Sequence, residues 1–338
     1  MKLIVYRTDC TNPYDNLATE EYLTMNAREG EVALFLWQNA HTIVIGKNQN
    51  PWRECNVEKI KEDGVYLSRR MSGGGAVYHD MGNLNFTFIA RDDLYDIAKQ
   101  TDTILLACRL MGINAVKTGR NDLVVNEKKF SGHAYYSSNG YNYHHGTIMM
   151  DVDFNDMPKY LRPSAAKLKS KGVESVRSRV TNLKDYLPNL AAAADASERQ
   201  IANARKKMIA KMQDAMVEAF GRNYGGEPVE CDLPPVPQEL KDRYASEEWR
   251  LGTRIPFEKE IENRFEWGEV DIQLAMKGGI IEQCRIYSDA LEFRIFDELE
   301  NKLVGCKYDA AAIIGIGLDP STTNREREVL RLIAGSVE

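Results

Sequence analysis

The sequence predicts a large mixed α/β domain followed by a small, β-rich domain that is closed by helices. Short β-branched and aromatic runs alternate with helical patterns through most of the chain, and a strongly alternating stretch follows after about residue 256. Glycine and proline are frequent in residues 221–240, which predicts an irregular segment before that stretch. We therefore expect a first domain at residues 1–246, a linker at 247–256 and a second domain at 257–338.

The N-terminal part predicts strands and two helices. Residues 12–30 have helical spacing, and Asn12 before Pro13 is a typical helix start. Within residues 95–113, apolar residues recur at helical spacing, which predicts a second helix. The strands, each a short β-branched or aromatic run that ends at turn formers, are residues 3–7, 32–37 and 42–46.

The middle of the first domain predicts more strands. Apolar and polar residues alternate over residues 76–90 and 122–154, which indicates paired strands. One hairpin is expected to turn at Asn139-Gly140, because this dipeptide accepts the positive φ angles of tight hairpin turns. Helical patterns then dominate from Asp156 to about Gly221.

A long helix is predicted over residues 197–220. Its methionines can mark a groove for a partner or a cofactor, but the helical period favours an apolar stripe that faces the core. That stripe comprises Ile201, Met208, Met212 and Phe220. In the second domain, residues 265–291 alternate as strands about a Gly278-Gly279 turn, and residues 325–335 predict a closing helix.

The composition restricts the function. The 338 residues carry 44 Lys and Arg against 50 Asp and Glu, a net charge of −6, whereas general nucleic-acid binding requires a basic surplus. No window approaches the roughly 18 apolar residues of a membrane span. The six cysteines include no C-x-x-C pair, and MKLIVYRTDC lacks the apolar run of a signal peptide. We expect a cytoplasmic protein with reduced thiols and no nucleic-acid or membrane partner.

The segment RRMSGGGAVYHDMGNLNFTF, residues 69–88, combines two arginines with three consecutive glycines. Glycine is costly to order, so a stable chain keeps three together where the backbone must go where a side chain is forbidden. Bare backbone N–H groups beside Arg69 and Arg70 suit an anion. A flexible turn between two strands explains the same pattern, and this segment alone does not decide between the two.

Two further segments combine glycine with positive charge. Lys129 stands immediately before Phe130-Ser131-Gly132, where an ammonium group either faces solvent or is directed at phosphate oxygens. Five cations then fall within 13 residues of a chain that is acidic on average, which indicates either a solvated face or a loop that closes over phosphate. These cations are Lys167, Lys169, Lys171, Arg177 and Arg179.

Several common signatures are absent from the sequence, which has no G-x-x-x-x-G-K-[ST], H-E-x-x-H or G-x-S-x-G motif. His144 and His145 are adjacent, so on a strand they face opposite ways and cannot share one metal ion. Three cationic, glycine-containing segments without these motifs predict a nucleotide site outside the P-loop class.

Five segments, taken together and in order, resemble the lipoate–protein ligase A family of biotin/lipoate protein ligases. They are RRMSGGGAVYHDMGNLNFTF, GRNDLVV, KKFSGHAYY, YHHGTIMMDVD and KGVESVRSRVTNL, and the resemblance extends over essentially all 338 residues. It implies an α/β (α+β) fold, in which a mixed β-sheet catalytic domain of the biotin/lipoate ligase type, with helices, precedes a small C-terminal α+β accessory domain. The accessory domain is expected to reorient during the cycle.

The resemblance implies an AMP-forming ligase that works in two steps. Lipoate, with octanoate as an alternative acid, attacks the α-phosphate of ATP, with Mg²⁺, to give lipoyl-AMP and pyrophosphate. The acyl group then passes to a specific lysine of an apo lipoyl domain of a 2-oxoacid dehydrogenase E2 subunit or of the glycine-cleavage H protein. No tightly bound metal is implied.

The resemblance also implies the roles of individual residues. Lys129 matches the catalytic lysine that contacts the phosphate and the lipoyl carbonyl oxygen, and Asp122 is expected to help to hold Mg²⁺ through the phosphates. The lipoate and nucleotide site is expected to include Arg70, Ser72, Gly73, Gly74, Gly75, Ala76, Val77, Tyr78 and Asn83. The adenylate-binding loop is expected to include Lys171, Gly172, Val173, Arg177, Ser178, Arg179, Val180, Thr181 and Asn182.

One residue departs from the family pattern, because His133 stands where a small residue is usual. Its imidazole either alters the preference for the acyl chain or faces the other side of the strand, and we expect the second.

Two rival functions are considered beside the ligase. An ATP-independent octanoyl or lipoyl transferase of the same fold would need an activated cysteine in the pocket, and none of the six cysteines falls in the three glycine-containing segments. A non-catalytic lipoate- or nucleotide-binding regulator would be marked by loss of Lys129 or of the glycine segment, and both are present.

Overall fold

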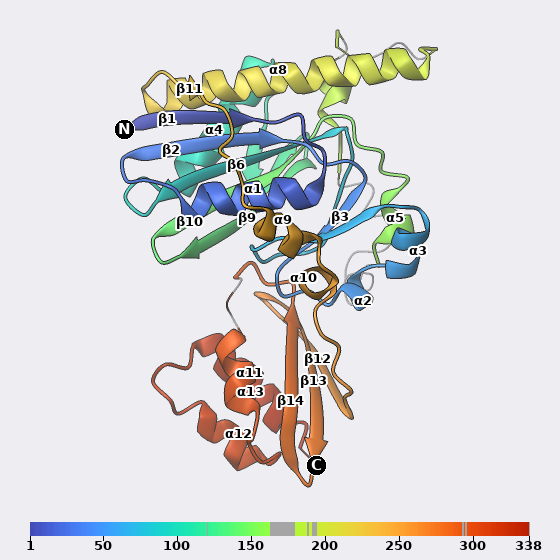
Figure 1. The fold of residues 1–338 in the computed structure, drawn as a ribbon, viewed down its shortest axis with the longest axis vertical. Coiled ribbons are helices and arrows are strands. Elements are labelled where there is room, and N and C mark those ends of the chain that lie inside the picture. The colour runs from blue at the N-terminus through green and yellow to red at the C-terminus, as the bar shows by residue number, and fades with distance from the viewer. Residues whose placement is uncertain are drawn as a thin grey trace.

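Separate hydrophobic cores lie in the N-terminal and C-terminal parts of the chain (Figure 1). The computed structural model describes residues 1–119, 121–162, 180–187, 189–190, 195–292, 294 and 296–337. The first core surrounds a large mixed sheet and the second surrounds a small antiparallel one, which confirms the predicted fold class.

The main sheet, in the described residues, has the strand order β11-β1-β2-β6-β10-β9-β8-β7. Strands β11, β1 and β2 run parallel, and the other neighbours pair antiparallel. Asn139 and Gly140, with φ angles of 52° and 77°, form the β9–β10 turn at the predicted place. The strands are β1 (Lys2–Arg7), β2 (Glu31–Trp37), β6 (Asn83–Arg91), β7 (Val116–Thr118), β8 (Asp122–Val125), β9 (Lys128–Ser138), β10 (Tyr141–Met149) and β11 (Val229–Glu230).

A second, small sheet flanks the glycine segment. Strand β3 (Thr42–Ile45) pairs parallel with β4 (Tyr66–Arg69) and antiparallel with β5 (Val77–His79). The chain therefore leaves β4 and enters β5 on opposite sides of one strand, and the intervening residues must cross the end of β3. Three short helices pack beside this sheet, namely α2 (Pro51–Glu54), α3 (Val57–Glu62) and α5 (Met157–Tyr160).

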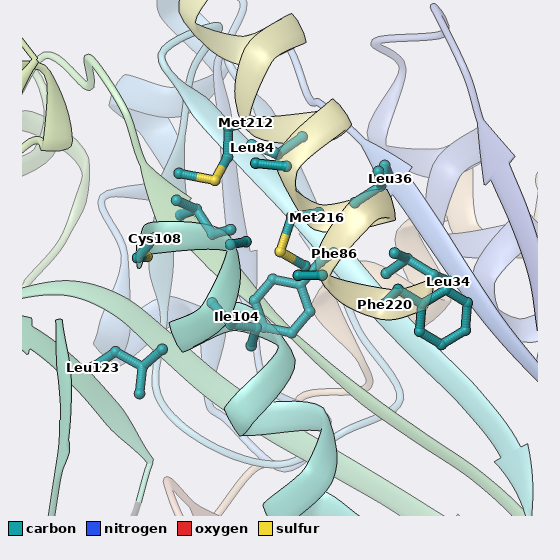
Figure 2. Packing of buried hydrophobic residues seen from close by; sticks show 14 of the residues in the cluster. Leu34, Leu36, Leu84, Phe86, Ile104, Cys108, Leu123, Met212, Met216 and Phe220 are labelled. Atoms are coloured by element: carbon teal, nitrogen blue, oxygen red, sulfur yellow. The ribbon is translucent and has the colours of Figure 1, made fainter. Parts of the chain in front are cut away.

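Helices cover both faces of the main sheet. Helix α1 (Pro13–Met25) begins where predicted, because the side chain of Asn12 accepts a hydrogen bond from the backbone N–H of Tyr14 at 2.9 Å. It packs with α9 (Gln238–Ala245) on one face, against Trp37. Helices α4 (Ile97–Leu110) and α8 (Glu198–Tyr224) pack on the other face (Figure 2).

The methionines of α8 belong to the core, as predicted. Met208, Met212 and Phe220 are buried in the core, and Figure 2 shows Met212 near Leu84, Met216 near Phe86 and Phe220 near Leu34. The predicted stripe is wrong at its first position, because Ile201 is 38% exposed. The first turns of α8 extend past the strands of the main sheet (Figure 1), so the sheet does not cover this part of the helix.

The C-terminal part is a three-stranded antiparallel sheet packed against helices. Its turn between β13 and β14 uses Gly278 and Gly279, with φ angles of 59° and 78°. Its core includes Ile272, Leu299 and Ile333. The elements are β12 (Lys259–Phe265), β13 (Gly268–Lys277), β14 (Ile280–Ser288), α11 (Asp297–Leu303), α12 (Ala310–Ile316) and α13 (Asn324–Ala334).

The predicted linker, residues 247–256, includes the short helix α10 (Glu247–Leu251). Trp249 Nε1 donates to the carbonyl oxygen of Arg69 at 2.8 Å, and Arg69 Nε donates to the carbonyl oxygen of Trp249 at 2.9 Å. The guanidinium of Arg69 also donates to the carbonyl oxygens of Gly46, Lys47, Gln49 and Arg250. Arg69 is thus a structural residue, and it ties α10 to the end of β3. A single-turn 3₁₀ helix, η1 (Leu183–Tyr186), completes the described elements.

Gly146→Ala is expected to destabilise the main sheet. A Cβ atom at Gly146 would lie 2.6 Å from the carbonyl oxygen of Gly132 and 2.7 Å from Cζ of Phe86, so β9 or the phenyl ring would have to move. We expect the free energy of unfolding in urea to fall by about 1–3 kcal/mol. The matched control is Gly315→Ala in α12, where no atom lies within 4 Å of the added Cβ and helix propensity favours alanine. Equal losses in the two variants would contradict the role of close packing.

Candidate active site

A cavity of about 190 Å³ opens between the glycine segment and the strands β6, β9 and β10. Leu17, Trp37, Val44 and Val77 make one part of its wall apolar, whereas Lys129 is its one ammonium group among the described lining residues. The complete lining is Leu17, Trp37, Val44, Arg70, Gly74, Gly75, Ala76, Val77, His79, Asn85, Asn121, Lys129, Gly132, His133, Ala134, His145, Gly146, Thr147 and Leu291.

The guanidinium of Arg70 holds the glycine segment from inside. It donates to the carbonyl oxygens of Gly73 and Gly75 at 2.8 Å each, to the carbonyl oxygen of Val44 at 3.3 Å and to Ser72 Oγ at 3.0 Å. Burial lowers the pKa of Arg70 to about 10, so it keeps its charge at neutral pH. The expected ligand-binding arginine therefore uses most of its donors to shape the loop.

Two of the three glycines, Gly73 and Gly74, are explained by close approaches within the chain. Gly74 has φ of 94°, and a Cβ there would lie 2.9 Å from Nη2 of Arg70. A Cβ at Gly73 would lie 2.3 Å from the carbonyl oxygen of Ala290, in the C-terminal part. The backbone N–H of Gly74 donates to that same oxygen at 2.7 Å. In this structure the C-terminal part therefore occupies one of the N–H groups that suit an anion.

A buried polar chain runs from α1 to the glycine segment. Nδ1 of His145 lies 2.8 Å from Oε1 of Glu20, and its Nε2 lies 2.8 Å from Oγ of Ser72. Thr87 Oγ1 donates to the same Glu20 oxygen at 2.7 Å. Since Arg70 Nε donates to Ser72 Oγ, the carboxylate of Glu20 and the cation of Arg70 are linked through an imidazole and a hydroxyl.

Lys129 lies at the start of β9 and forms an ion pair with Asp122 on β8, with Nζ 2.7 Å from Oδ1. Its side chain crosses Gly132, where a Cβ would lie 2.9 Å from Nζ. The carbonyl oxygen of Lys129 accepts from the backbone N–H of Thr181 at 2.9 Å, and Lys129 bridges in parallel with Val180. The described end of the expected adenylate-binding loop is thus joined to the strand that carries the lysine.

The structure brings six of the expected site residues to the cavity wall, namely Arg70, Gly74, Gly75, Ala76, Val77 and Lys129. Ser72, Gly73 and Asp122 stand behind them, in contact with lining residues. Lys171, Gly172, Val173, Arg177, Ser178 and Arg179 lie outside the described residues.

Four expected residues have other partners in this structure. Tyr78 lies on the opposite face of β5 from the cavity, and its ring stacks on Tyr160 at 6.5 Å between centroids. Asn83 donates to Oδ1 of Asn85, which borders the cavity in its place. The amide of Asn182 pairs with both backbone groups of Val152 at 2.9 Å, and the hydroxyl of Thr181 lies 3.4 Å from Asp185.

The lining residues that were not predicted come from distant strands. Trp37, Asn85 and Thr147 are register partners on β2, β6 and β10, so their side chains share one face of the sheet. His145, within β10, and Asn121, immediately before β8, also border the cavity. These residues could be identified only from the register in which the strands pair, and a single sequence does not reveal that register.

His133 borders the cavity, but its ring is bound elsewhere. Nδ1 lies 2.9 Å from Nε2 of His144 and Nε2 lies 3.0 Å from Oγ of Ser131, while the edge of Phe86 packs on the ring. Burial lowers the pKa of His133 to about 3, so the imidazole is neutral. Its side chain packs with the residues under α4, where Gln100 contacts His144.

Three features of other functional classes are absent from the described residues: a cysteine at the cavity wall, a cluster of metal ligands and a membrane-spanning helix. None of the six cysteines borders the cavity. The described residues hold no group of three His, Cys, Asp or Glu side chains that could bind a metal ion. No helix within the described ranges has the length and apolar character needed to cross a bilayer.

The fold and the cavity define a catalytic domain of the lipoyl ligase type. Residues 12–229 match the family model of the lipoyl protein ligase A/B catalytic domain, and residues 254–318 match that of the bacterial lipoate protein ligase C-terminus. The chain belongs to the lipoate–protein ligase family.

Individual relatives agree with this placement. Lipoate-protein ligase A of Psychrobacter cryohalolentis is 38% identical over 323 residues, which cover 91% of this chain and 90% of the relative. P. falciparum LipL1, solved in complex with lipoate, has a TM-score of 0.79 at 25% identity over 98% of both chains. A lipoate-protein ligase A solved with bound ATP shares the fold, with a TM-score of 0.58 at 23% identity over 74% of this chain and 98% of that one.

Ser72→Ala is expected to destabilise the protein, because it leaves Nε2 of His145 buried without its partner. We expect a loss of about 1–3 kcal/mol in the free energy of unfolding, measured by urea denaturation. Ser68→Ala is the matched control, since Ser68 is equally buried but its Oγ has no hydrogen-bond partner in the described residues. If Ser68→Ala cost as much as Ser72→Ala, the polar chain would not be the cause.

Proposed function

We propose that this chain is an AMP-forming lipoate–protein ligase, which activates lipoate with ATP and transfers the lipoyl group to a lysine of an acceptor protein. The observation that carries the proposal is the cavity, in a chain of this family, which combines an apolar wall with the ammonium group of Lys129. A medium-length acyl chain suits the apolar wall, and its carboxylate suits Lys129.

In the first half-reaction, a carboxylate oxygen of lipoate attacks the α-phosphorus of ATP. The bond to the bridging oxygen breaks, and lipoyl-AMP and pyrophosphate form. Negative charge develops on the phosphoryl oxygens during this step, and a fixed ammonium group stabilises it. The ion pair with Asp122 positions the ammonium group of Lys129 for this role. The side chain of Lys129 passes over Gly132, which has no Cβ to obstruct it.

In the second half-reaction, the ε-amine of the acceptor lysine attacks the lipoyl carbonyl carbon. The carbonyl oxygen becomes negative, the bond to AMP breaks, and an amide forms with loss of a proton. The same ammonium group of Lys129 stabilises that oxygen. The chemistry needs no covalent enzyme intermediate, which agrees with the absence of a cysteine from the cavity wall described here.

Most of the remaining expected residues keep their proposed roles. Asp122 would contact Mg²⁺ that arrives with ATP, and a single carboxylate fits an ion held mainly by phosphates. The glycine segment with Ala76 and Val77 would contact lipoate and the nucleotide, whereas Tyr78 and Asn83, expected in the same site, have other partners in this structure. Residues 171–173 and 177–182 would close over the adenylate, anchored at Val180–Asn182 beside Lys129.

The two parts of the chain are proposed to share the work. Residues 1–246 would form the catalytic domain, 247–256 the linker and 257–338 the accessory domain. Since the carbonyl oxygen of Ala290 now accepts from the N–H of Gly74, the accessory domain would have to withdraw before that group can bind a ligand. Apo lipoyl domains of E2 subunits and the glycine-cleavage H protein are the proposed acceptors, and the cytoplasm is the proposed location.

Lys129→Ala is expected to abolish the reaction while the fold is kept. The assay incubates the enzyme with lipoate, ATP, Mg²⁺ and an apo lipoyl domain, and intact-mass analysis measures the lipoylated fraction. We expect the initial rate to fall by at least about 100-fold, the size of a lost charge-stabilising group.

Lys128→Ala is the matched control, because Lys128 is the neighbouring lysine and is exposed. We expect it to keep the wild-type rate. An acceptor that gains no ATP-dependent mass with the wild-type enzyme, beside a competent ligase, would refute the function itself. Wild-type turnover by Lys129→Ala would refute only the role of the lysine.

A further inference from the structure

His79 lines the cavity beside Trp37 and carries a buried polar atom without a partner in the described residues. Strand β5 alternates, so Val77 and His79 face the cavity while Tyr78 faces away. The ring of His79 packs edge-on against Trp37, with 6.4 Å between centroids. Its Nε2 is buried and has no hydrogen-bond partner in the described residues.

The surrounding amides determine which nitrogen of His79 carries the proton. Asn16 Nδ2 donates to the backbone carbonyl oxygens of Cys10 at 3.0 Å and Gln38 at 2.8 Å, which only a nitrogen can do. The same nitrogen donates to Oδ1 of Asn39 at 3.0 Å. The other amide atom of Asn39, Nδ2, therefore faces Nδ1 of His79 at 3.2 Å and donates to it.

It follows that His79 presents a donor. Nδ1 is the acceptor, so the proton of the neutral ring is on Nε2. Burial lowers the pKa of His79 to about 3, which keeps the ring neutral at physiological pH. A buried N–H without an acceptor is costly, so an acceptor is expected on whatever fills the cavity.

A second unpartnered amide atom, Nδ2 of Asn85, also lies at the cavity wall. Asn85 is the register partner of Thr147, whose Oγ1 accepts from the backbone N–H of Gly132, beside Lys129. Asn85 is also the register partner of Trp37, so it lies between the apolar part of the wall and Lys129. His79 belongs to the end that Leu17, Trp37 and Val44 make apolar, where the tail of an acyl chain would lie.

We propose that Nε2–H of His79 donates a hydrogen bond to a sulfur atom of the lipoate dithiolane ring, and that His79 is a specificity-determining residue that favours lipoate over octanoate. The proposal rests on the proposed ligase function. A divalent sulfur is a weak acceptor that matches a neutral donor in an apolar wall, whereas the tail of octanoate offers only C–H groups and leaves the donor unpaired.

The test compares two substitutions, each of which replaces the function of only one of the two imidazole nitrogens. His79→Asn keeps an acceptor near the Nδ1 position for Asn39 and removes the Nε2 donor. His79→Gln places an amide N–H near the Nε2 position and gives up the contact with Asn39. For each enzyme, kcat/KM is measured with lipoate and with octanoate on the same apo lipoyl domain, and the ratio of the two values is the readout.

We expect His79→Asn to lower the lipoate-to-octanoate ratio by about 3- to 10-fold, which is the effect of one hydrogen bond, and His79→Gln to keep it within about 2-fold of wild type. A ratio in His79→Asn equal to that of the wild type would overturn the proposal, as would an equal drop in both variants. Failure of the wild-type enzyme with both acids would instead refute the ligase function.

A measurement on the wild-type enzyme covers the case in which a variant does not fold. Two octanoate analogues, with a methylthio group on carbon 6 or on carbon 8, are compared with octanoate under the same conditions. At least one is expected to exceed octanoate in kcat/KM by about 3-fold, because it supplies the acceptor without the ring. If neither exceeds octanoate, the hydrogen bond from His79 is not what selects the acid.

Discussion

The buried guanidinium of Arg70 is the contact on which the site depends. A cation without a carboxylate in direct contact survives burial because carbonyl dipoles and a hydroxyl surround it. Those carbonyls belong to Val44, Gly73 and Gly75, so satisfying the charge also sets the path of the chain between β4 and β5. Only glycine accepts that path at Gly74, where φ is 94° and a Cβ would approach Nη2 of Arg70. The buried charge of Arg70 is stable only with the loop in this shape, and the loop keeps this shape because of its hydrogen bonds to Arg70.

The cavity wall combines apolar side chains with one ammonium group among the described lining residues, and these come from different elements of the fold. Lys129, at the start of β9, has its charge balanced by Asp122. Another part of the wall holds Leu17, Trp37 and Val44, and the ionisable side chains that border the cavity beside them, His79 and His145, are neutral or hydrogen-bonded. Burial keeps His79 uncharged, and His145 is hydrogen-bonded to Glu20. An acid with an apolar tail is the kind of molecule that such a division can orient.

The C-terminal part takes part in the site although its core is separate. The carbonyl oxygen of Ala290 accepts from Gly74, Leu291 borders the cavity, and Lys47 pairs with Asp297 at 2.9 Å. The glycine segment therefore meets a partner on each side, with Arg70 beneath it and residues 290–291 above it. A ligand that needs the N–H of Gly74 must compete with a contact inside the chain.

What the sequence by itself determined was whatever local chemistry and periodicity encode. The Asn139-Gly140 turn, the start of α1 at Asn12 and the buried methionines of α8 followed from it, because turn angles, caps and periodic stripes depend on neighbours in the chain. The fold of a lipoate–protein ligase followed from the resemblance of five segments to that family. The cavity wall was a different matter. Trp37, Asn85 and Thr147 meet only through strand register, and the proton of His79 is placed by Asn16 and Asn39 from elsewhere in the chain. Arg70 was expected to bind a ligand, and tertiary structure gave most of its donors to the loop instead. Contacts between segments far apart in sequence decide such matters, since which backbone carbonyl or amide lies within hydrogen-bond distance is a property of the folded chain alone.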